Sequence, residues 1–430
     1  MRYRSNDTPP TRAEIDRIIF HKGPSDDDES RLSGFLRRMR SACFLNAKKP
    51  LSPLSRLVAQ YAKDGLVLFL GAGVSYESGI PNWSELSREL LLKAGVEPNG
   101  IEAVRKALPS YIAQFELAGQ ILGSRGFVEG VYRALYGNLK CKSQLESIPV
   151  KWDDQKDWPG WSRVLGALKP NKTLEAVGNL LMFGEGMDLR RNPQVHAVLT
   201  SNVDNLLELY CLAKSRGKRV LTWIDRASVG EHPDETPVYH LHGFLDARRD
   251  NLLKSVSEEP LAGDLQEITD ELLPDLIFRE SEYYESIASP VSFINHTPQS
   301  FFRRFNVLFI GTALEELNMR RWLHDSFQER VQHRTKFLRE FYRKRYADAE
   351  YEAALTSMRH FWLRPNTEVD SDQARKRWRV PQDAVQRVMS NLGVQVVWCR
   401  DYDGIRDCLN QVRRSGDSPG FGRQPAPYRS

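Results

Sequence analysis

The sequence contains no apolar run long enough to cross a membrane, which takes about 20 residues, and its first stretch, Met1 to Asp28, is mostly polar. A secretory leader needs a continuous apolar core of about 7–15 residues near the amino terminus. We therefore expect neither a leader nor a membrane anchor, and we expect a cytoplasmic protein.

Cysteine is scarce and scattered. Five occur in 430 residues, and no two of them stand at the two-residue spacing of a zinc-binding pair; they are Cys43, Cys141, Cys211, Cys399 and Cys408. A structural zinc site of the four-cysteine kind needs such pairs, and a secreted disulfide framework favours an even, clustered set. We therefore expect free thiols in a reducing compartment and no zinc or other bound metal.

Charge of either sign is nearly balanced. The chain has 61 basic and 56 acidic residues, a net charge of +5, and 41% of its residues are hydrophobic. Such a small excess does not by itself require a nucleic-acid partner, and the apolar content is enough for a buried core. The length suits one large or two ordinary domains.

One stretch combines a buried strand with a glycine turn. Leu66 to Leu70 is a five-residue apolar run, and Gly71 and Gly73 follow it directly. Glycines at such a turn let backbone amides approach a phosphate, especially where a helix follows, as it does from Trp83. The pattern is not a full dinucleotide-binding fingerprint, because Tyr76 stands where the third glycine would be, so a simple packing turn is the alternative.

Further apolar runs alternate with helical periodicity along the chain and predict further strands. They are Val195–Thr200, Val238–Gly243, Phe305–Ile310, His360–Leu363 and Val394–Trp398. Strands that alternate with helices predict an α/β fold: a Rossmann-like parallel sheet with helices on both faces, here with an inserted helical module. Polar clusters follow several of these strands, so we expect a ligand crevice along the carboxyl edge of the sheet.

The helical patterns also divide the chain. We expect an N-terminal extension with one helix, a main domain containing a helical module and a later basic helical region, and a disordered tail; the ranges are 1–50, 51–412, 83–191, 319–359 and 413–430. Between Arg320 and Arg345 nine residues are basic and three are acidic. This region reads either as a solvated charged face or as a surface for nucleic acid or a protein partner.

Three polar residues after the predicted strands could carry chemistry. Asn202 and Asp204 stand before a helical run, where either could be a helix cap. His242 and His240 should share one face of a strand because side chains alternate along it, with His240 packing beneath His242. A lone histidine is more often a core residue than a catalyst, so the residues alone leave both readings open.

Four segments, taken together, resemble the signatures of the Sir2 (sirtuin) superfamily in the same order. They are Gly71-Ala72-Gly73-Val74-Ser75 with Ser78-Gly79-Ile80-Pro81, then Thr200-Ser201-Asn202-Val203-Asp204, then His242-Gly243, then Gly311-Thr312-Ala313-Leu314-Glu315-Glu316-Leu317-Asn318. The resemblance covers roughly Gly65 to Val412. Many relatives carry Ser at the position of Ala313 and Asp at that of Glu316.

The resemblance implies NAD+ as the substrate and assigns roles. Asn202 would orient the ribose or an attacking water, Asp204 would hold the nicotinamide carboxamide, and His242 would be the general base. The other implied NAD+ contacts are Gly71, Ala72, Gly73, Ser75, Ile80, Pro81, Thr200, Gly311, Thr312, Asp401 and Tyr402.

Two departures from the deacylating sirtuins refine this expectation. The chain lacks the four-cysteine zinc module, and it reads Gly79-Ile80-Pro81-Asn82-Trp83-Ser84 where those enzymes read Gly-Ile-Pro-Asp-Phe-Arg. Both are typical of a bacterial Sir2-like branch that hydrolyses NAD+ to nicotinamide and ADP-ribose in abortive defence against phage. Members of this branch act as homo-oligomers or together with a partner that senses infection, such as a HerA-type ATPase. We therefore expect any contact with nucleic acid to be indirect.

Two other functions stay open at this point. One is an NAD-dependent protein deacylase or ADP-ribosyltransferase, which would use the same pocket with a peptide nucleophile. The other is a non-catalytic module that binds NAD+ or ADP-ribose and acts through the basic region. A pure binder would not need Asn202, Asp204 and His242 together.

Overall fold

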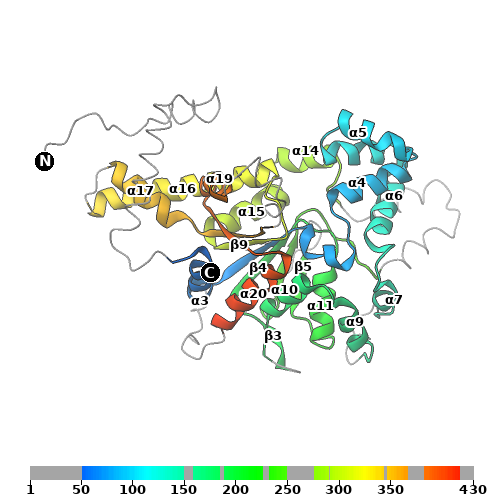
Figure 1. Cartoon of the computed structure of the whole chain (residues 1–430), viewed down its shortest axis with the longest axis horizontal. Helices are drawn as coiled ribbons and strands as arrows, with labels where there is room; N and C mark the ends of the chain where they lie inside the picture. Colours follow the sequence, from blue (N-terminus) through cyan, green and yellow to red (C-terminus); the bar gives the residue numbers. More distant parts are fainter. Residues whose placement is uncertain are drawn as a thin grey trace.

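The computed structural model describes residues 51–149, 158–184, 188–225, 232–248, 276–289, 291–342, 346–366 and 382–416 (Figure 1). The helix expected within residues 1–50 lies outside these ranges. None of the helices in them combines the length and apolarity needed to cross a membrane.

The described residues are built around a seven-stranded sheet in which every pairing is parallel. The strand order is β5-β6-β4-β1-β7-β8-β9. The bounds are β1 Leu66–Leu70, β4 Val195–Thr200, β5 Leu221–Ile224, β6 Thr236–His240, β7 Val307–Ile310, β8 His360–Pro365 and β9 Val394–Cys399. A separate hairpin pairs β2 (Met182–Phe183) with β3 (Arg190–Arg191).

Helices cover both faces of this sheet (Figure 1). One face carries α3 (Pro53–Asp64), α10 (Lys172–Leu181), α11 (Leu206–Lys214) and α20 (Tyr402–Gly416), and the other carries α15 (Phe293–Arg304), α16 (Leu317–Tyr342) and α19 (Gln382–Ser390). The remaining helices are α4 (Trp83–Lys93), α5 (Ile101–Ala107), α6 (Tyr111–Tyr136), α7 (Lys142–Glu146), α9 (Trp161–Leu168), α14 (Glu280–Ala288) and α17 (Tyr346–Ser357). The predicted α/β class with a parallel, doubly covered sheet is confirmed.

Strand β1 explains why the sheet needs both layers. Its five residues are all buried, with Leu66, Leu68 and Leu70 in one hydrophobic cluster and Val67 and Phe69 in the other. Successive side chains of a strand point to opposite faces, so an uninterrupted apolar run must be covered twice.

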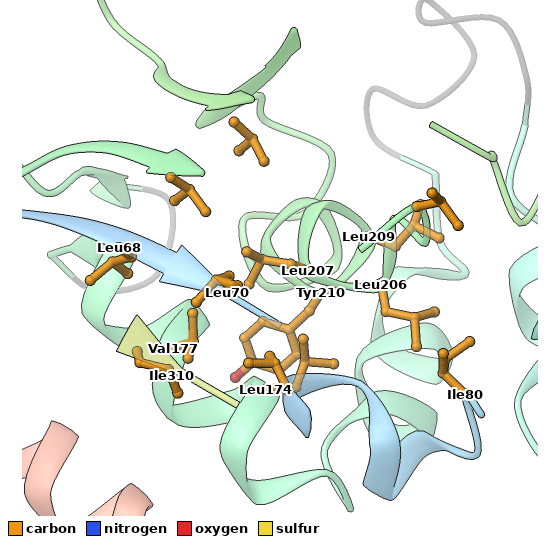
Figure 2. Packing of buried hydrophobic residues seen from close by; sticks show 14 of the residues in the cluster. Leu68, Leu70, Ile80, Leu174, Val177, Leu206, Leu207, Leu209, Tyr210 and Ile310 are labelled. Carbon is orange, nitrogen blue, oxygen red and sulfur yellow. The ribbon is translucent and has the colours of Figure 1, made fainter. Parts of the chain in front are cut away.

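The first of these clusters anchors the helices beside the site. In Figure 2, Leu174 and Val177 of α10 and Tyr210 of α11 lie close to Leu70 of β1 and Ile310 of β7. All five side chains are almost fully buried. Burying apolar surface at roughly 25 cal/mol per Å² makes this packing the main force that fixes α11 against the end of β1.

Most predicted elements lie where the periodicity placed them, with local differences. The edge strand β5 was not predicted. Helix α6 is broken at Gly123, whose φ of +67° is one that glycine adopts far more readily than other residues. Helix α20 continues to Gly416, so residues 413–416, which we expected in the tail, are helical.

The basic region is made of two helices. Along α16, Leu323, Phe327, Val331 and Leu338 are buried, as their helical spacing predicts. The last three pack against Ala349 and Ala353 of α17. The described part of the region therefore consists of two amphipathic helices that pack together through their apolar sides.

Candidate functional site

The direction of chain progression reverses between β1 and β7. The chain moves from β1 toward β4 on one side and from β7 toward β8 on the other, and β1 and β7 are neighbours. In open parallel sheets, loops that diverge at such a point leave a crevice outside the carboxyl ends of the strands. The loops here begin at Gly71 and Gly311.

These two glycine turns contact each other directly. The Gly73 amide donates to the Gly311 carbonyl at 2.9 Å, and the Gly71 amide donates to that of Ile310 at 3.0 Å. A Cβ added at Gly71 would lie 2.6 Å from the Gly311 oxygen. Close backbone approach therefore accounts for the glycines, as the packing alternative proposed, and these two amides are already engaged within the protein.

We expected the amino terminus of helix α4 to lie directly at the first glycine turn, but α4 starts further along the chain. Two short 3-10 turns, η1 (Ala72–Val74) and η2 (Tyr76–Ser78), separate β1 from α4. Asn82 and Glu85 close the start of α4 with a reciprocal capping box, at 3.0 and 2.9 Å. Because the Glu85 carboxylate sits at that helix start, the simple strand–turn–helix phosphate cradle was a wrong prediction for α4.

We expect Gly311→Ala to destabilise the fold by about 2–4 kcal/mol, because φ there is +66° and the new Cβ would lie 2.7 Å from the Val74 amide nitrogen. The matched control is Gly95→Ala, where φ is +87° but nothing lies within 4 Å of the added Cβ. Backbone strain alone should then cost about 1–2 kcal/mol. Equal losses for the two variants in urea unfolding would show that the contact between the turns contributes nothing.

The loop after β4 brings Asn202 and Asp204 to the first glycine turn. Asn202 Nδ2 donates to the Gly71 carbonyl at 3.2 Å, and the Asn202 amide donates to Thr200 Oγ1 at 3.0 Å. Ser75 Oγ donates to Asp204 Oδ1 at 2.9 Å. Turn and loop thus form one hydrogen-bonded unit containing Gly71, Ser75, Thr200, Asn202 and Asp204.

Asp204 is buried and has an unusual pKa. Burial raises it from its ordinary value to about 6, against the lowering effect of hydrogen bonds from Ser75 and the Leu206 amide. The Leu206 amide donates to Asp204 at 3.2 Å, at the start of α11. Asp204 therefore also caps this helix, as the alternative interpretation of the sequence proposed. A carboxylate held in this state, next to a cavity, is typical of functional sites.

We expect Asp204→Asn to stabilise the protein at pH 7 by up to about 3 kcal/mol, the cost of ionising a carboxyl whose pKa rises from 3.8 to about 6 on folding. The folded state binds the extra proton, so this contribution of Asp204 is favourable at low pH and is lost as pH rises from about 4 to about 6. Asparagine keeps an acceptor oxygen for Ser75 and carries no charge. Urea unfolding at several pH values should show the two proteins diverging across that window; curves that stay parallel would contradict the assignment.

We predicted that His240 and His242 share one face of a strand, but in the structure they do not. Strand β6 ends at His240, so the alternation does not extend to His242. His240 contacts Glu208 of α11, whereas His242 lies against Trp83 and Tyr283. The packing of His240 beneath His242 was therefore a wrong prediction.

His240 forms a buried ion pair that holds the Asn202 loop. Its Nε2 lies 2.7 Å from Glu208 Oε1, and its Nδ1 lies 3.0 Å from the Asn202 carbonyl. Both partners accept hydrogen bonds, so both ring nitrogens carry protons. Burial lowers the pKa of His240, but Glu208, the Asn202 carbonyl and Asp204 together outweigh it, so the pKa is raised overall.

His242 is held by one nitrogen. Its Nδ1 lies 2.9 Å from the Ile277 carbonyl, which accepts only, so Nδ1 carries the proton and Nε2 of the neutral ring has the lone pair. The ring lies edge-on to Trp83, with centroids 5.8 Å apart, and parallel to Tyr283 at 6.5 Å. This is the tautomer that a general base acting through Nε2 needs.

A cavity of about 30 Å³ lies at the carboxyl ends of β1 and β4. Its walls come from the first glycine turn and the residues that follow it, from α4 and α6, from the loop after β4 and from Phe278. The lining residues are Ala72, Ile80, Pro81, Trp83, Leu86, Leu135, Ser201, Asn202, Val203, Asp204 and Phe278. His242 is not among them and lies behind Trp83. Sites for drug-sized ligands measure about 300–1,000 Å³, so this crevice is closed to a nucleotide in the conformation described.

Sequence reasoning missed the residues that connect these parts. Tyr283, which lies parallel to His242, donates to Glu316 and accepts from Asn318 Nδ2 at 2.8 Å, and so ties the segment after Gly311 to the histidine. Asn171 donates to the Val74 carbonyl at 2.8 Å and accepts from the Leu174 amide at 2.9 Å. The helix-cap signal of an Asn before a helical run could have identified Asn171; nothing local marks Tyr283.

Asp401 and Tyr402 lie at the start of α20, at the same edge of the sheet. The Asp401 carboxylate accepts from the Gly404 amide at 2.8 Å, so it caps that helix, and Tyr402 is exposed. Lys172 Nζ contacts Asp403 at 2.9 Å, and its amide donates to Glu77 of η2 at 2.8 Å. The structure brings both residues near η2, without a described contact to Asn202, Asp204 or His242.

Metal-binding side chains are not gathered in the part of the chain that the structure describes. No group of three or more His, Cys, Asp or Glu in those ranges could hold an ion. Four cysteines in them are buried and free, and Cys43 lies outside.

A family model described as a SIR2-like domain matches residues 196–379, which is less than half of the chain. The matched part starts within β4 and contains Asn202, Asp204, His242 and Gly311, but not the turn at Gly71. No curated protein matches the chain. The match supports the resemblance to the Sir2-like superfamily and indicates NAD-related catalysis in general.

Proposed function

We propose that this protein is an NAD+ glycohydrolase that cleaves the bond between nicotinamide and ribose. The observation that carries the proposal is that Asn202 and Asp204 line one cavity and are hydrogen-bonded to the first glycine turn, Asn202 through the Gly71 carbonyl and Asp204 through Ser75. The His242 ring contacts Trp83, which also lines this cavity. Water would add to the ribose carbon as the nicotinamide nitrogen leaves with the bonding electrons. The products are nicotinamide, ADP-ribose and one proton.

Each residue then has a role that its surroundings support. As the bond breaks, positive charge moves from the nicotinamide ring to the ribose, and an ionised Asp204 in a water-poor site would stabilise it strongly. Asn202 would hold the ribose or the water through its side chain, and His242 Nε2 would take up the proton of the water. Because Asp204 has a pKa of about 6, turnover should fall as pH drops through that value.

The tight surroundings of His242 favour water over a peptide as the nucleophile. The ring is 5% exposed and lies between Trp83 and Tyr283. An acyl-lysine side chain would need a channel to the ribose in addition to the opening that NAD+ requires, whereas water needs only about 30 Å³. Together with the missing four-cysteine zinc module, this favours hydrolysis over deacylation.

The closed crevice supports a regulated enzyme. A volume of about 30 Å³ cannot hold nicotinamide and ribose, so NAD+ must bind to an opened form. An enzyme that depletes NAD+ would harm its host unless opening were controlled. We propose that self-association, or a partner such as a HerA-type ATPase, opens the crevice during phage infection and that NAD+ loss then acts as abortive defence.

The test follows nicotinamide and ADP-ribose after purified protein is mixed with NAD+, across a range of protein concentrations, for the wild type and Asn202→Ala. We expect nicotinamide and ADP-ribose in equal amounts from the wild type and a large loss in the variant. Release of acyl-ADP-ribose from an acylated peptide would instead identify a deacylase. NAD+ binding with no cleavage at any concentration or with any partner would leave only a binding module.

A further inference from the structure

Helices α15, α16 and α17 line a second, open hollow of about 510 Å³. It lies at the amino ends of β7 and β8, because α15 ends at Arg304 just before β7 and α17 ends at Ser357 just before β8. The strands are parallel, so this is the edge of the sheet opposite the glycine turns. Its volume lies within the range of about 300–1,000 Å³ that is usual for small-molecule sites.

The wall of this hollow is strongly basic. Four arginines, Arg303, Arg330, Arg334 and Arg359, line it with one carboxylate, that of Glu329. Glu329 already pairs with Arg303 at 2.8 Å. Within the ranges that the structure describes, no carboxylate forms an ion pair with the other three guanidinium groups, so four arginines and one glutamate leave the lining strongly positive.

Arg330 is held rigidly at the base of the wall. Its Nη1 donates to the Phe302 carbonyl at 2.7 Å and its Nε to that of Ser357 at 3.4 Å, while Nη2 lies 3.3 Å from His360 Nε2. Neutral carbonyls position the guanidinium without neutralising it. Burial, and then Arg359, lower the pKa of Arg330 to about 10, so it stays charged at neutral pH.

The same field acts on the neighbouring histidine. Burial, and then Arg330 and Arg359, hold the pKa of His360 well below its ordinary value. A cluster of like charges that lines one open hollow attracts anions more strongly than the same arginines scattered over the surface would. Guanidinium forks match phosphate oxygens in geometry as well as charge.

We propose that this hollow binds a phosphorylated small molecule of nucleotide size. The guanidinium groups of Arg330, Arg334 and Arg359 would hold the phosphates. The hollow is larger than a bare phosphate needs, and the Phe337 ring at its rim is 40% exposed, with the Arg334 guanidinium 5.6 Å from its centroid. That ring offers an apolar surface to a base, and the volume of about 510 Å³ suits a ligand of nucleotide size. The proposal does not depend on NAD+ cleavage.

The test is calorimetric titration of the full-length protein with ADP and inorganic pyrophosphate, using adenosine as the uncharged probe. We expect ADP and pyrophosphate to bind, adenosine to show no binding, and affinity to fall with added salt. Arg334→Glu should weaken ADP binding about 10- to 100-fold, because a charge-assisted contact is replaced by a repulsive one. Arg334 is exposed, so the variant should fold normally, which circular dichroism checks.

Two further variants make the result decisive. Lys336→Glu makes the same charge change on α16 outside the hollow, and we expect it to change ADP affinity by no more than about 3-fold. Asn202→Ala alters the crevice at the other edge of the sheet and shows whether ADP binds there. Equal weakening by Lys336→Glu would mean general attraction and overturn the site. Loss of ADP binding in Asn202→Ala but not in Arg334→Glu would place the ligand in the crevice instead. A third outcome is that ADP shows no saturable binding while single-stranded DNA binds more tightly as its length increases. That result would mean that the basic surface binds nucleic acid, and it would overturn the proposal.

Discussion

His242→Ala is expected to lower kcat for NAD+ cleavage about 10²–10⁴-fold, the usual contribution of a general base, under conditions in which the wild type turns over. The Ile277 carbonyl at 2.9 Å keeps the proton on Nδ1, so Nε2 can accept the proton of a water. Alanine removes that acceptor and leaves the Asn202–Asp204 loop in place, because His242 makes no described hydrogen bond to it. Nicotinamide release, measured by chromatography, is the readout.

The control for this variant is His324→Ala, which removes a half-exposed imidazole on α16. It should turn over NAD+ at the wild-type rate. His242 packs between Trp83 and Tyr283, so the variant will also lose some stability, and kcat must be compared at a temperature where both proteins are fully folded. Turnover within 3-fold of the wild type would mean that the base is another group, or that hydrolysis needs none.

Glu208→Ala is expected to destabilise the fold by about 3–5 kcal/mol, because it leaves the buried His240 without its counter-charge. The variant should also lower kcat/KM, since His240 holds the Asn202 carbonyl at 3.0 Å. Glu208 is therefore a positioning residue. Urea unfolding and NAD+ turnover, measured on the same preparations, test the two effects.

The pH dependence separates this pair from a general packing loss. The pKa of His240 is raised in the folded protein, so its stabilising contribution is complete below its ordinary pKa and is lost as pH rises through the raised value. The difference between wild type and Glu208→Ala should therefore shrink toward alkaline pH. Glu208→Gln, which keeps an acceptor oxygen, should lose less. Glu146→Ala, at an exposed pair with Lys142, should change stability by less than about 1 kcal/mol. A pH-independent difference would contradict the ion pair.

The positions of the polar clusters were predictable because parallel strands impose them. The apolar runs that became β1, β4 and β7 have local signatures, and in a parallel sheet their carboxyl ends meet at one edge. This is why Gly71, Asn202 and Gly311, far apart in the chain, could be expected together. Strand β5 could not be predicted, because a four-residue strand at the edge of a sheet is too short to show a clear apolar pattern.

The sequence by itself determined the class of the fold and the edge of the sheet at which the polar clusters gather, since these follow from apolar periodicity, glycine positions and helix starts within a few residues. Only the tertiary structure decided that His240 and His242 have different surroundings, that Tyr283 connects Glu316 to the His242 ring, that the crevice is closed to about 30 Å³, and that four arginines and one carboxylate line one hollow. Each of these depends on contacts across about 30 residues or more of chain, and no local pattern specifies the distance between two side chains brought together by packing.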